Sequence, residues 1–245
     1  MSEPGATAAG RIFLPAVDST NAEAFRRAPD LTGPLWIVAE EQTAGRGRRA
    51  RPWSSPKGNF YGTLVQRIAD PPQRLGLRSF VAALALHDAL VAVTGLPMAF
   101  ALKWPNDVLM NGGKISGVLL EATGDMLAIG IGVNLFSAPP AEAVEDGAVR
   151  PVALWSETGL RIPPAVFLDA LAPAMAGWEA MFRLQGFAPL RSAFLTRAAR
   201  LGQTIRARTG TETHSGVFET IDAEGNLILR TAAGRIAIPA ADVFF

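Results

Sequence analysis

The sequence contains no cysteine, two histidines and three lysines among its 245 residues. The absence of cysteine excludes a disulfide framework, a thiolate metal site and a cysteine nucleophile. His87 and His214 are too few for a histidine-rich metal centre, and they supply a Ser-His-Asp triad poorly. The lysines are Lys57, Lys103 and Lys114, in a chain with 23 basic residues. Because arginine is used almost wherever a cation is needed, each lysine is a candidate for chemistry that a guanidinium cannot perform.

The chain also lacks a strong charge of one sign and a targeting segment. The net charge is +1, so no global basic field marks a dedicated nucleic-acid binder. Residues 1–11 lack the basic and apolar regions of a secretory signal. The most apolar run, residues 80–100, is interrupted by charged and turn-forming residues, which predicts a buried helix and a turn rather than a membrane span. With 49% apolar residues the chain can form a packed core, and we expect a soluble cytoplasmic protein without a membrane partner.

The pattern along the chain predicts a larger domain at residues 1–199 and a β-barrel domain of about 45 residues at 200–245. Thr20 and Glu23 have the spacing of a capping box, which predicts a helix start. Turn sequences at 111–113 and 123–125 separate β-rich runs and predict an antiparallel meander. Strands are predicted at 11–17, 34–41, 59–68, 99–104, 107–110, 115–122 and 126–136, helices at 18–28, 77–93, 152–159 and 163–200, and an exposed loop at 138–150.

Residues 40–53, with the sequence EEQTAGRGRRARPW, contain four arginines and two glycines and almost nothing that could pack in a core. GRGRRA matches the dinucleotide-binding pattern formally, but prolines follow where that pattern must open a helix. GGK before Ile115 is likewise no P-loop, because the upstream glycine and the following Ser/Thr are missing. Three interpretations stay open: a solvated basic turn, a nucleic-acid contact with Trp53 as the one nearby aromatic residue, and a mobile lid that orders over an anionic ligand.

The segment KWPNDVLMNGGKISGVLLE, residues 103–121, holds two of the three lysines. Pro105 predicts a sharp turn after a strand, and the hairpin turn that follows can return Lys114 to the side of Asp107. An ordinary surface ion pair, which contributes little, would have the same pattern. However, Gly117 leaves open the face that Lys114 lines, and a compact ammonium can approach both a carboxylate and a phosphate. With Asp107 as a ligand of Mg²⁺, the two segments together indicate nucleotidyl transfer onto a carboxylate.

Five segments, DSTN, EQTAGRGRR with RPW, KWPNDV, GKISGVLLE and IGIGVN, resemble in order and spacing the signature segments of bacterial biotin–protein ligases. The resemblance covers essentially the whole chain. It implies an α+β fold with a mixed sheet and flanking helices, similar to class II aminoacyl-tRNA synthetases, and a small C-terminal Src-homology-3-like β-barrel. It also implies that biotin and ATP, with Mg²⁺, form biotinyl-5′-AMP, from which biotin passes to a lysine of the biotin carboxyl carrier protein of acetyl-CoA carboxylase.

The resemblance also implies roles for individual residues of these segments. Lys114, Arg48 and Asp107 are expected to be catalytic, with Lys114 between the biotin carboxylate and the α-phosphate and Asp107 at the metal. The residues expected to contact biotin are Ser19, Thr20, Asn21, Gln42, Gly45, Arg46, Gly47, Arg48, Lys114 and Gly117. The residues expected to contact ATP are Arg46, Arg48, Arg49, Trp53, Asn106, Lys114 and Asn134.

The sequence departs from the family pattern in small ways. Ala50 stands where a third loop glycine is frequent, which predicts a stiffer loop, and Ser116 stands where alanine is frequent. Fewer than twenty residues precede DSTN, which leaves no room for the DNA-binding domain of some members, so we expect no sequence-specific DNA binding. Two other functions stay open: a lipoate or octanoate ligase of the same superfamily, and a non-catalytic module that binds biotin or a nucleotide. Other biotin-dependent carboxylases as acceptors, and a homodimer through sheet edges, stay open as well.

Overall fold

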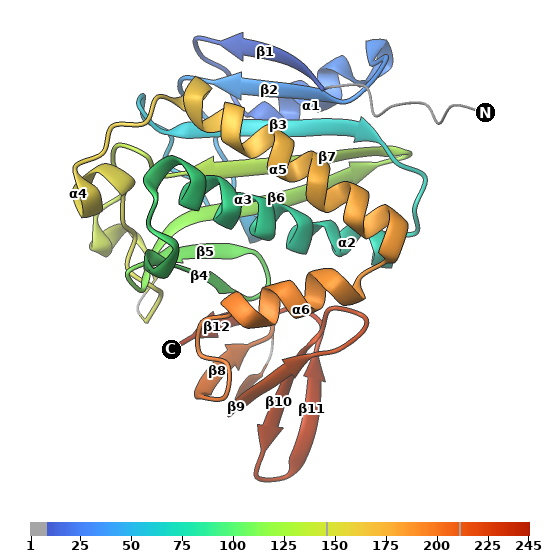
Figure 1. Ribbon diagram of the computed structural model, residues 1–245, viewed down its shortest axis with the longest axis vertical. Helices are drawn as coiled ribbons and strands as arrows, with labels where there is room; N and C mark the ends of the chain where they lie inside the picture. Colours follow the sequence, from blue (N-terminus) through green and yellow to red (C-terminus); the bar gives the residue numbers. More distant parts are fainter. Residues whose placement is uncertain (1–8, 146, 211) are drawn as a thin grey trace.

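The computed structural model describes residues 9–145, 147–210 and 212–245, which form two sheets with flanking helices (Figure 1). The larger sheet has seven strands in the order β1-β2-β3-β7-β6-β5-β4, and the smaller has five in the order β11-β10-β9-β8-β12. The strands of the larger sheet are β1 Gly10–Leu14, β2 Leu35–Ala39, β3 Phe60–Arg67, β4 Phe100–Lys103, β5 Asp107–Met110, β6 Gly113–Thr123 and β7 Met126–Val133. Those of the smaller sheet are β8 Thr204–Arg208, β9 Thr213–Ile221, β10 Leu227–Thr231, β11 Gly234–Ile238 and β12 Asp242–Phe244.

The larger sheet is mixed, as predicted. β1 runs parallel to β2, and the other neighbouring strands are antiparallel, including the predicted meander from β4 to β7. Asn111 and Gly112 have φ angles of 49° and 79° at the β5–β6 turn, and Gly124 has a φ of 59° at the β6–β7 turn. Glycine and asparagine tolerate this left-handed region better than other residues do, which explains why these sequences turn here.

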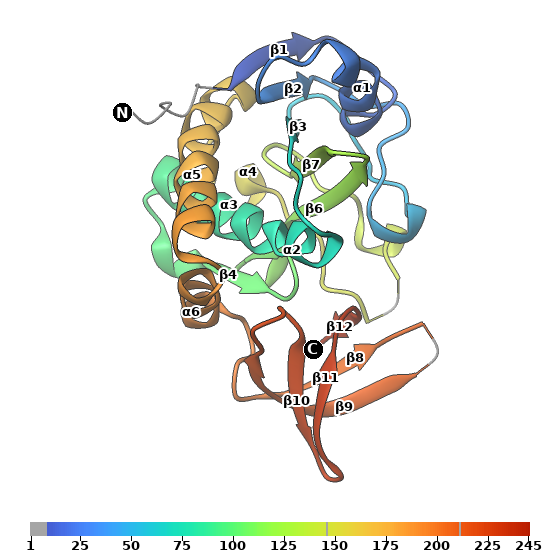
Figure 2. The same ribbon diagram turned by 90° about the vertical axis from the view of Figure 1, so that its right-hand side faces the viewer.

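Helices cover both faces of the larger sheet (Figures 1 and 2). The helices α3 (Arg78–Thr94) and α5 (Pro164–Gln185) pack together over one face, and α1 (Thr20–Arg27) lies against the other, on β2, β3 and β7. Side chains of a strand alternate between the faces. Trp36 and Val38 therefore join the main core beneath α3, whereas Ile37 joins a small cluster with Ala24 of α1. Because this second cluster is small, the α1 face has room for polar groups.

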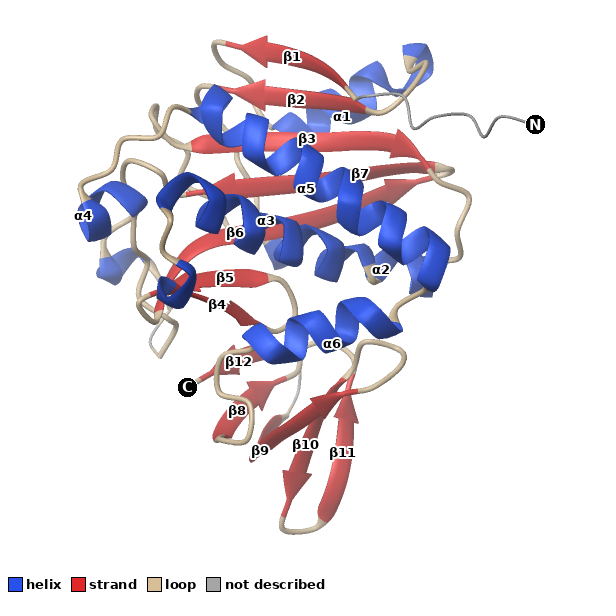
Figure 3. Ribbon diagram, viewed as in Figure 1, coloured by secondary structure: helices blue, strands red, loops and turns tan. Residues whose placement is uncertain are grey.

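The predicted buried helix within residues 80–100 is confirmed. By length and composition two helical segments, Pro72–Thr94 and Pro164–Gln185, could cross a membrane. In the fold, α3 is buried along most of its length between the sheet and α5, and Gly95 ends it with a φ of 71°. The remaining helices are α2 Pro72–Gly76, α4 Leu154–Thr158 and α6 Ala188–Arg197, as Figure 3 shows.

The predicted capping box at the first helix is wrong. The N-cap is Ser19, and Thr20 is the first helical residue, so Thr20 and Glu23 do not have the required positions. Glu23 instead pairs with Arg26 and Arg27 within the helix. The Thr20 side chain is therefore available for other contacts, which are described below.

Two element ends also differ from the predictions. The first strand ends at Leu14, before Pro15, rather than at residue 17. The helix predicted over 163–200 is divided into α5 and α6, because Gly186 adopts a φ of 76°. After α6 the chain enters the smaller sheet at β8, and the boundary between residues 199 and 200 stays a prediction. The two sheets are in contact, since the indole N–H of Trp104 donates a 3.0 Å hydrogen bond to the carbonyl oxygen of Gly225.

Candidate active site

A small cavity opens on the α1 face of the larger sheet, and glycines of β6 and β7 form its floor. A Cβ atom at Gly132 would lie 2.5 Å from Nε1 of Trp53, and one at Gly117 would lie 3.1 Å from the same ring. These positions need glycine, because only bare backbone lets an indole ring and a ligand come this close. Predicted ligand contacts that line the cavity are Ser19, Thr20, Asn21, Gln42, Arg46, Trp53 and Gly117.

One wall of the cavity is a chain of hydrogen bonds around Gln42. Its Oε1 accepts a 2.9 Å bond from the backbone N–H of Thr20 and lies 3.2 Å from the Thr20 hydroxyl. Its Nε2 donates to the Ser55 hydroxyl at 3.0 Å. The Ser19 side chain makes no capping bond and faces the same space. These bonds fix the orientation of the Gln42 amide, so the wall presents ordered donors and acceptors of the kind that suits a urea-like group.

A second group of polar side chains lies next to this wall. The side-chain amide of Asn21 donates to Oε2 of Glu121 at 2.7 Å, and its Oδ1 is 2.6 Å from the hydroxyl of Thr63. The other carboxylate oxygen of Glu121 lies 3.7 Å from Arg46. Glu121 thus connects the buried Asn21 to a half-exposed arginine at the rim of the cavity, and it holds that arginine in position.

Asp107 lies between two lysines. Its Oδ1 is 2.8 Å from Nζ of Lys114, and its Oδ2 is 3.6 Å from Nζ of Lys103. The β4–β5 hairpin pairs Lys103 with Asp107 in register, and β6 brings Lys114 back beside them. Burial raises the pKa of Asp107, but the positive charges of Lys114 and Lys103 outweigh this effect, so the pKa lies below its ordinary value. Asp107 is therefore ionised at neutral pH and orients both ammonium groups.

The two lysines have different surroundings. Burial lowers the pKa of Lys103, against the opposing attraction of Asp107, and its side chain is only 12% exposed. The side chain of Lys114 is 31% exposed, and its Nζ lies 5.8 Å from the centroid of the Trp53 ring. Lys114 is therefore the lysine that a ligand can reach. Since Trp53 belongs to the arginine-rich segment, the structure brings the two predicted motifs together at one place.

The arginine-rich segment forms a closed loop that its own backbone stabilises. The N–H of Gly47 donates to the carbonyl oxygen of Arg51 at 2.8 Å, and the N–H of Trp53 donates to that of Gly45 at 2.9 Å. A Cβ atom at Gly45 would lie 2.6 Å from the Ser55 hydroxyl, so this position excludes a side chain. We therefore expect the backbone of Gly45 to be the part of the loop that comes closest to a ligand.

Two residues of this loop adopt left-handed backbone geometry. Arg49 and Ala50 both have a φ of 56°. For residues with a Cβ atom this region costs roughly 1–2 kcal/mol. Ala50 thus occupies a position that glycine would adopt with less strain, and its effect on the stiffness of the loop stays a prediction.

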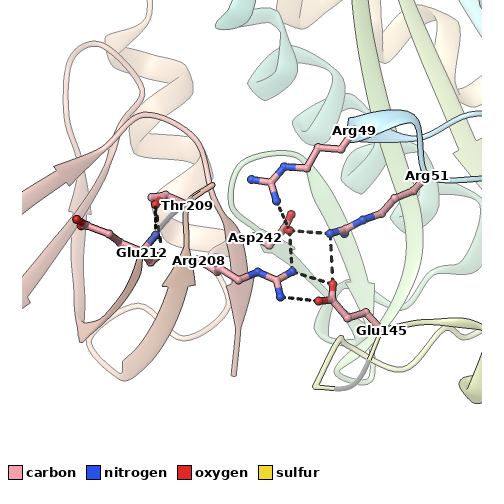
Figure 4. A network of polar contacts seen from close by, with 7 residues as sticks. All are labelled: Arg49, Arg51, Glu145, Arg208, Thr209, Glu212 and Asp242. Atoms are coloured by element: carbon pink, nitrogen blue, oxygen red, sulfur yellow. Dashed lines mark hydrogen bonds and ion pairs between the residues drawn. The ribbon is translucent and has the colours of Figure 1, made fainter.

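The arginines of the loop divide into two pairs. Arg46 lines the cavity, and the charge of Arg48 acts on Asp107. Arg49 and Arg51 point instead to the smaller sheet, where their guanidinium groups lie 2.7 and 2.9 Å from Oδ2 of Asp242 (Figure 4). The structure therefore places Arg49, expected at ATP, against the C-terminal sheet.

Two asparagines expected at ATP are buried and bonded to backbone. Asn106 donates from Nδ2 to the carbonyl oxygen of Val118 at 3.2 Å, and Asn134 donates to that of Val152 at 3.1 Å. Asn106, just before β5, is thereby bonded to β6, and Asn134, just after β7, is bonded to the segment before α4. Their contacts with ATP stay predictions, as does the contact of Gly47 with biotin.

Asp107 does not suit a resident Mg²⁺ site in this arrangement. Both of its carboxylate oxygens face ammonium groups, at 2.8 and 3.6 Å, and the local charge is positive. Within the described ranges no group of three or more His, Cys, Asp or Glu side chains could hold a metal ion. A magnesium ion would need carboxylate oxygens that are free of such cations.

Sequence analysis missed several residues that shape the cavity. Gly130 and Gly132 lie in the segment IGIGVN. Because they are two residues apart, they lie on the same face of the strand and leave that face without side chains. Glu121 is the last residue of the segment GKISGVLLE, but no role was predicted for it. Thr63 and Ser55 carry no local pattern that could have identified them, because the cavity-wall side chains that they bond, Thr20 and Gln42, lie 43 and 13 residues away.

Comparison with known proteins relates this arrangement to a family. The Biotin/lipoate A/B protein ligase family matches residues 13–134, and the Biotin protein ligase C terminal domain matches residues 201–245. A curated biotin–[acetyl-CoA-carboxylase] ligase of Paracoccus denitrificans is 56% identical over 95% of this chain and 99% of its own length. The chain belongs to the biotin protein ligase family.

Solved biotin protein ligases have the same fold. The ligase from Aquifex aeolicus in complex with biotin and ATP has a TM-score of 0.82 at 27% identity, over 96% of this chain and 97% of that chain. The ligase from Leishmania major in complex with biotinyl-5-AMP has a TM-score of 0.67 at 27% identity, over 94% and 99% of the two chains. The predicted mixed sheet with flanking helices and a C-terminal β domain is therefore the biotin protein ligase fold.

Proposed function

We propose that this biotin protein ligase uses ATP to attach biotin to a lysine of the biotin carboxyl carrier protein of acetyl-CoA carboxylase. The Paracoccus relative is named a biotin–[acetyl-CoA-carboxylase] ligase, the Aquifex ligase is solved in complex with biotin and ATP, and the Leishmania ligase is solved in complex with biotinyl-5-AMP. The observation that carries the proposal is the 2.8 Å contact of Lys114 with Asp107, beside Gly117 of the cavity. That contact fixes one reachable ammonium group at the end of a slot with bare backbone as its floor.

The cavity suits the two ends of biotin. The Gln42 wall, with Ser19 and Thr20, supplies donors and acceptors for the ureido ring. In the structure the Trp53 ring covers the glycine floor, so we expect this ring to move when the valeryl chain lies against β6 and β7 and the carboxylate reaches Lys114. Neutralisation of the carboxylate by an oriented ammonium lets it approach the negatively charged triphosphate.

In the first step a carboxylate oxygen of biotin attacks the α-phosphorus of ATP. A new P–O bond forms, the bond to the β-phosphate bridging oxygen breaks, and pyrophosphate leaves with that electron pair. Lys114 and Arg48 supply positive charge where negative charge accumulates, and Asp107 keeps Lys114 in place. Most of the catalysis is thus positioning and charge neutralisation.

In the second step the amine of the acceptor lysine attacks the carbonyl carbon of biotinyl-5′-AMP. An amide bond forms, the bond to the phosphate oxygen breaks, AMP leaves, and the amine loses its proton. Arg46 at the cavity rim and Arg48 near Asp107 would cover the adenylate and keep water away from the mixed anhydride until the acceptor arrives.

We infer that Mg²⁺ arrives with ATP rather than on a resident carboxylate site, because Asp107 is occupied by two lysines. Magnesium commonly keeps several waters and binds through substrate phosphates. Its contribution when bound is to neutralise the phosphate oxygens. Asp107 then acts through Lys114 rather than as a metal ligand.

Pyrophosphate release tests the proposal. The protein is incubated with MgATP alone and with biotin, lipoate or octanoate. Release that depends on biotin supports the proposal, and release that depends on lipoate or octanoate instead moves the protein to the sister family of ligases. Binding of biotin by folded protein without release with any acid supports a non-catalytic binding module.

Finer predictions about location and partners extend the proposal. We propose action in the cytoplasm, without DNA or a membrane as a partner, with other biotin-dependent carboxylases as further acceptors. A homodimer through sheet edges is the proposed assembly. Sedimentation of the protein at micromolar concentration distinguishes a dimer from a monomer, and salt-resistant binding of operator DNA would contradict the absence of a DNA partner.

A further inference from the structure

A network of ion pairs holds the arginine loop, within residues 40–53, against the C-terminal sheet (Figure 4). Asp242, the first residue of β12, accepts from Arg49 at 2.7 Å, from Arg51 at 2.9 Å and from Arg208 of β8 at 3.2 Å. Glu145, in the segment before α4, contacts Arg51 at 3.3 Å and Arg208 at 2.5 Å. The loop that flanks the cavity is thus tied to a sheet whose strands begin more than 150 residues later in the sequence.

The charges of this network do not balance. Three guanidinium groups share two carboxylates, and Asp242 contacts all three guanidinium groups. Asp242 is also the least exposed member, at 17%, whereas the exposed fractions of the other four side chains lie between 35% and 50%. Removal of the Asp242 charge would leave Arg51 and Arg208 with Glu145 and would take away the Asp242 contact of Arg49, and repulsion among the three cations would favour release of the loop.

The same strand reaches the lysine pair of the site. The ring of Phe245, which follows β12, lies 5.9 Å from Nζ of Lys103, and Asp242 adds a favourable charge for Lys103. The C-terminal segment from Asp242 to Phe245 therefore contacts both motifs of the site, the arginine loop through Asp242 and the KWPND segment through Phe245. A strand that served only the C-terminal sheet would have no need of either contact.

We propose that Asp242 is a positioning residue, which holds the outer half of the arginine loop through Arg49 and Arg51 so that Arg46 and Arg48 face the ligand. The C-terminal sheet thereby sets how firmly the loop closes over the adenylate. This inference rests on the proposed function. It gives Arg49 a structural task at the sheet in place of the expected contact with ATP.

Loss of the Asp242 contacts should therefore affect retention of the adenylate and not its formation. Asp242 touches none of the groups that line the cavity, so the reacting atoms keep their arrangement whenever the loop is closed. Loss of the Asp242 charge raises the fraction of protein with an open loop. An open loop weakens the binding of biotin and ATP and lets the adenylate escape, whereas the maximal rate of adenylate formation changes little.

The test compares Asp242→Asn with the wild type in pyrophosphate release and in the labelling of a bystander protein by escaped biotinyl-5′-AMP. We expect KM for biotin and ATP to rise about tenfold, bystander labelling to rise about tenfold, and kcat to stay within about twofold. Tenfold corresponds to about 1.4 kcal/mol. Asp242→Glu keeps the charge and should restore most of the wild-type behaviour.

The matched control is Glu219→Gln, which removes a carboxylate of the same sheet that pairs with Arg230 and Arg235. It should change neither KM nor labelling. If Asp242→Asn fails to fold, the double variant Arg49→Gln with Arg51→Gln cuts the same contacts from the loop side and should give the same result.

Three results overturn the proposal or its premise in distinguishable ways. A wild type that releases no pyrophosphate with biotin removes the proposed function itself. An active wild type with Asp242→Asn unchanged in KM and labelling overturns the positioning role alone. A variant that loses thermal stability and kcat together, without any rise in labelling, would show that Asp242 only stabilises the fold.

Discussion

Replacement of Asp107 with asparagine removes the carboxylate that lies between two lysines. The side chain is 14% exposed, and its oxygens lie 2.8 Å from Lys114 and 3.6 Å from Lys103. Loss of one partner of a buried ion pair costs about 3–5 kcal/mol, because the remaining charge is left without compensation. Asparagine keeps the shape and one acceptor, so we expect the lower end, about 3 kcal/mol. For a chain of this size that lowers the melting temperature by roughly 6–12 °C.

The same substitution should impair adenylation. Lys114 loses a charge-assisted hydrogen bond, whose contribution is roughly 1.5–3 kcal/mol, so biotin-dependent pyrophosphate release should fall by about 10- to 150-fold. The control is Asp125→Asn, which removes a pair with Arg67 in which both side chains are about half exposed, at 52% and 48%. Such a surface pair contributes at most about 1 kcal/mol, and the control should leave adenylation unchanged.

The pH dependence of stability gives an independent check. The folded pKa of Asp107 lies below its ordinary value of about 3.9, because the lysines outweigh the effect of burial. Its contribution to stability is therefore complete above that ordinary value and disappears as the pH falls through the folded pKa. The difference in unfolding free energy between wild type and Asp107→Asn should narrow below about pH 4. Wild-type stability and adenylation in Asp107→Asn at neutral pH would show that Asp107 neither stabilises the fold nor positions Lys114.

Three further substitutions test other parts of the site. Lys114→Ala should abolish adenylate formation in a protein that still folds, with a lower melting temperature because Asp107 keeps only Lys103 as a partner. Wild-type pyrophosphate release in that variant would contradict its role. Gly132→Ala places a Cβ atom 2.5 Å from Nε1 of Trp53. The overpacking should weaken biotin binding, measured by calorimetry, by roughly 5- to 150-fold, whereas the control Gly177→Ala meets no described atom within 4 Å and should not change binding. Ser116→Ala removes a buried hydroxyl that has no hydrogen-bond partner among the described residues, so the free energy of unfolding should rise by about 1 kcal/mol; a decrease would contradict this account.

The contact of Lys114 with Asp107 could be predicted because it is local. Lys114 lies seven positions after Asp107. A strand, a Pro-containing turn and a hairpin turn bring it back beside Asp107, and each of these has a sequence pattern. The meander and the buried helix at α3 were predictable for the same reason: alternation and turn residues report local geometry.

Long-range contacts have no such pattern. Asp242 binds arginines 191 and 193 residues earlier in the chain. The sequence could not show this pairing, so Arg49 was expected at ATP because its neighbours in the sequence were. The capping box failed for a related reason, since Thr20 has the right spacing from Glu23 but its hydroxyl is used by Gln42 in the cavity wall. Local spacing permits several partners, and tertiary packing selects among them.

Transfer of biotin to its acceptor is the decisive test of the proposed activity. A carboxyl carrier domain is incubated with the protein, biotin and MgATP, and the mass of the domain is measured before and after proteolytic mapping. We predict one added biotinyl group on a single lysine, dependent on both biotin and ATP and absent with Lys114→Ala. An unmodified carrier domain in the presence of folded wild-type protein that binds biotin would contradict this prediction.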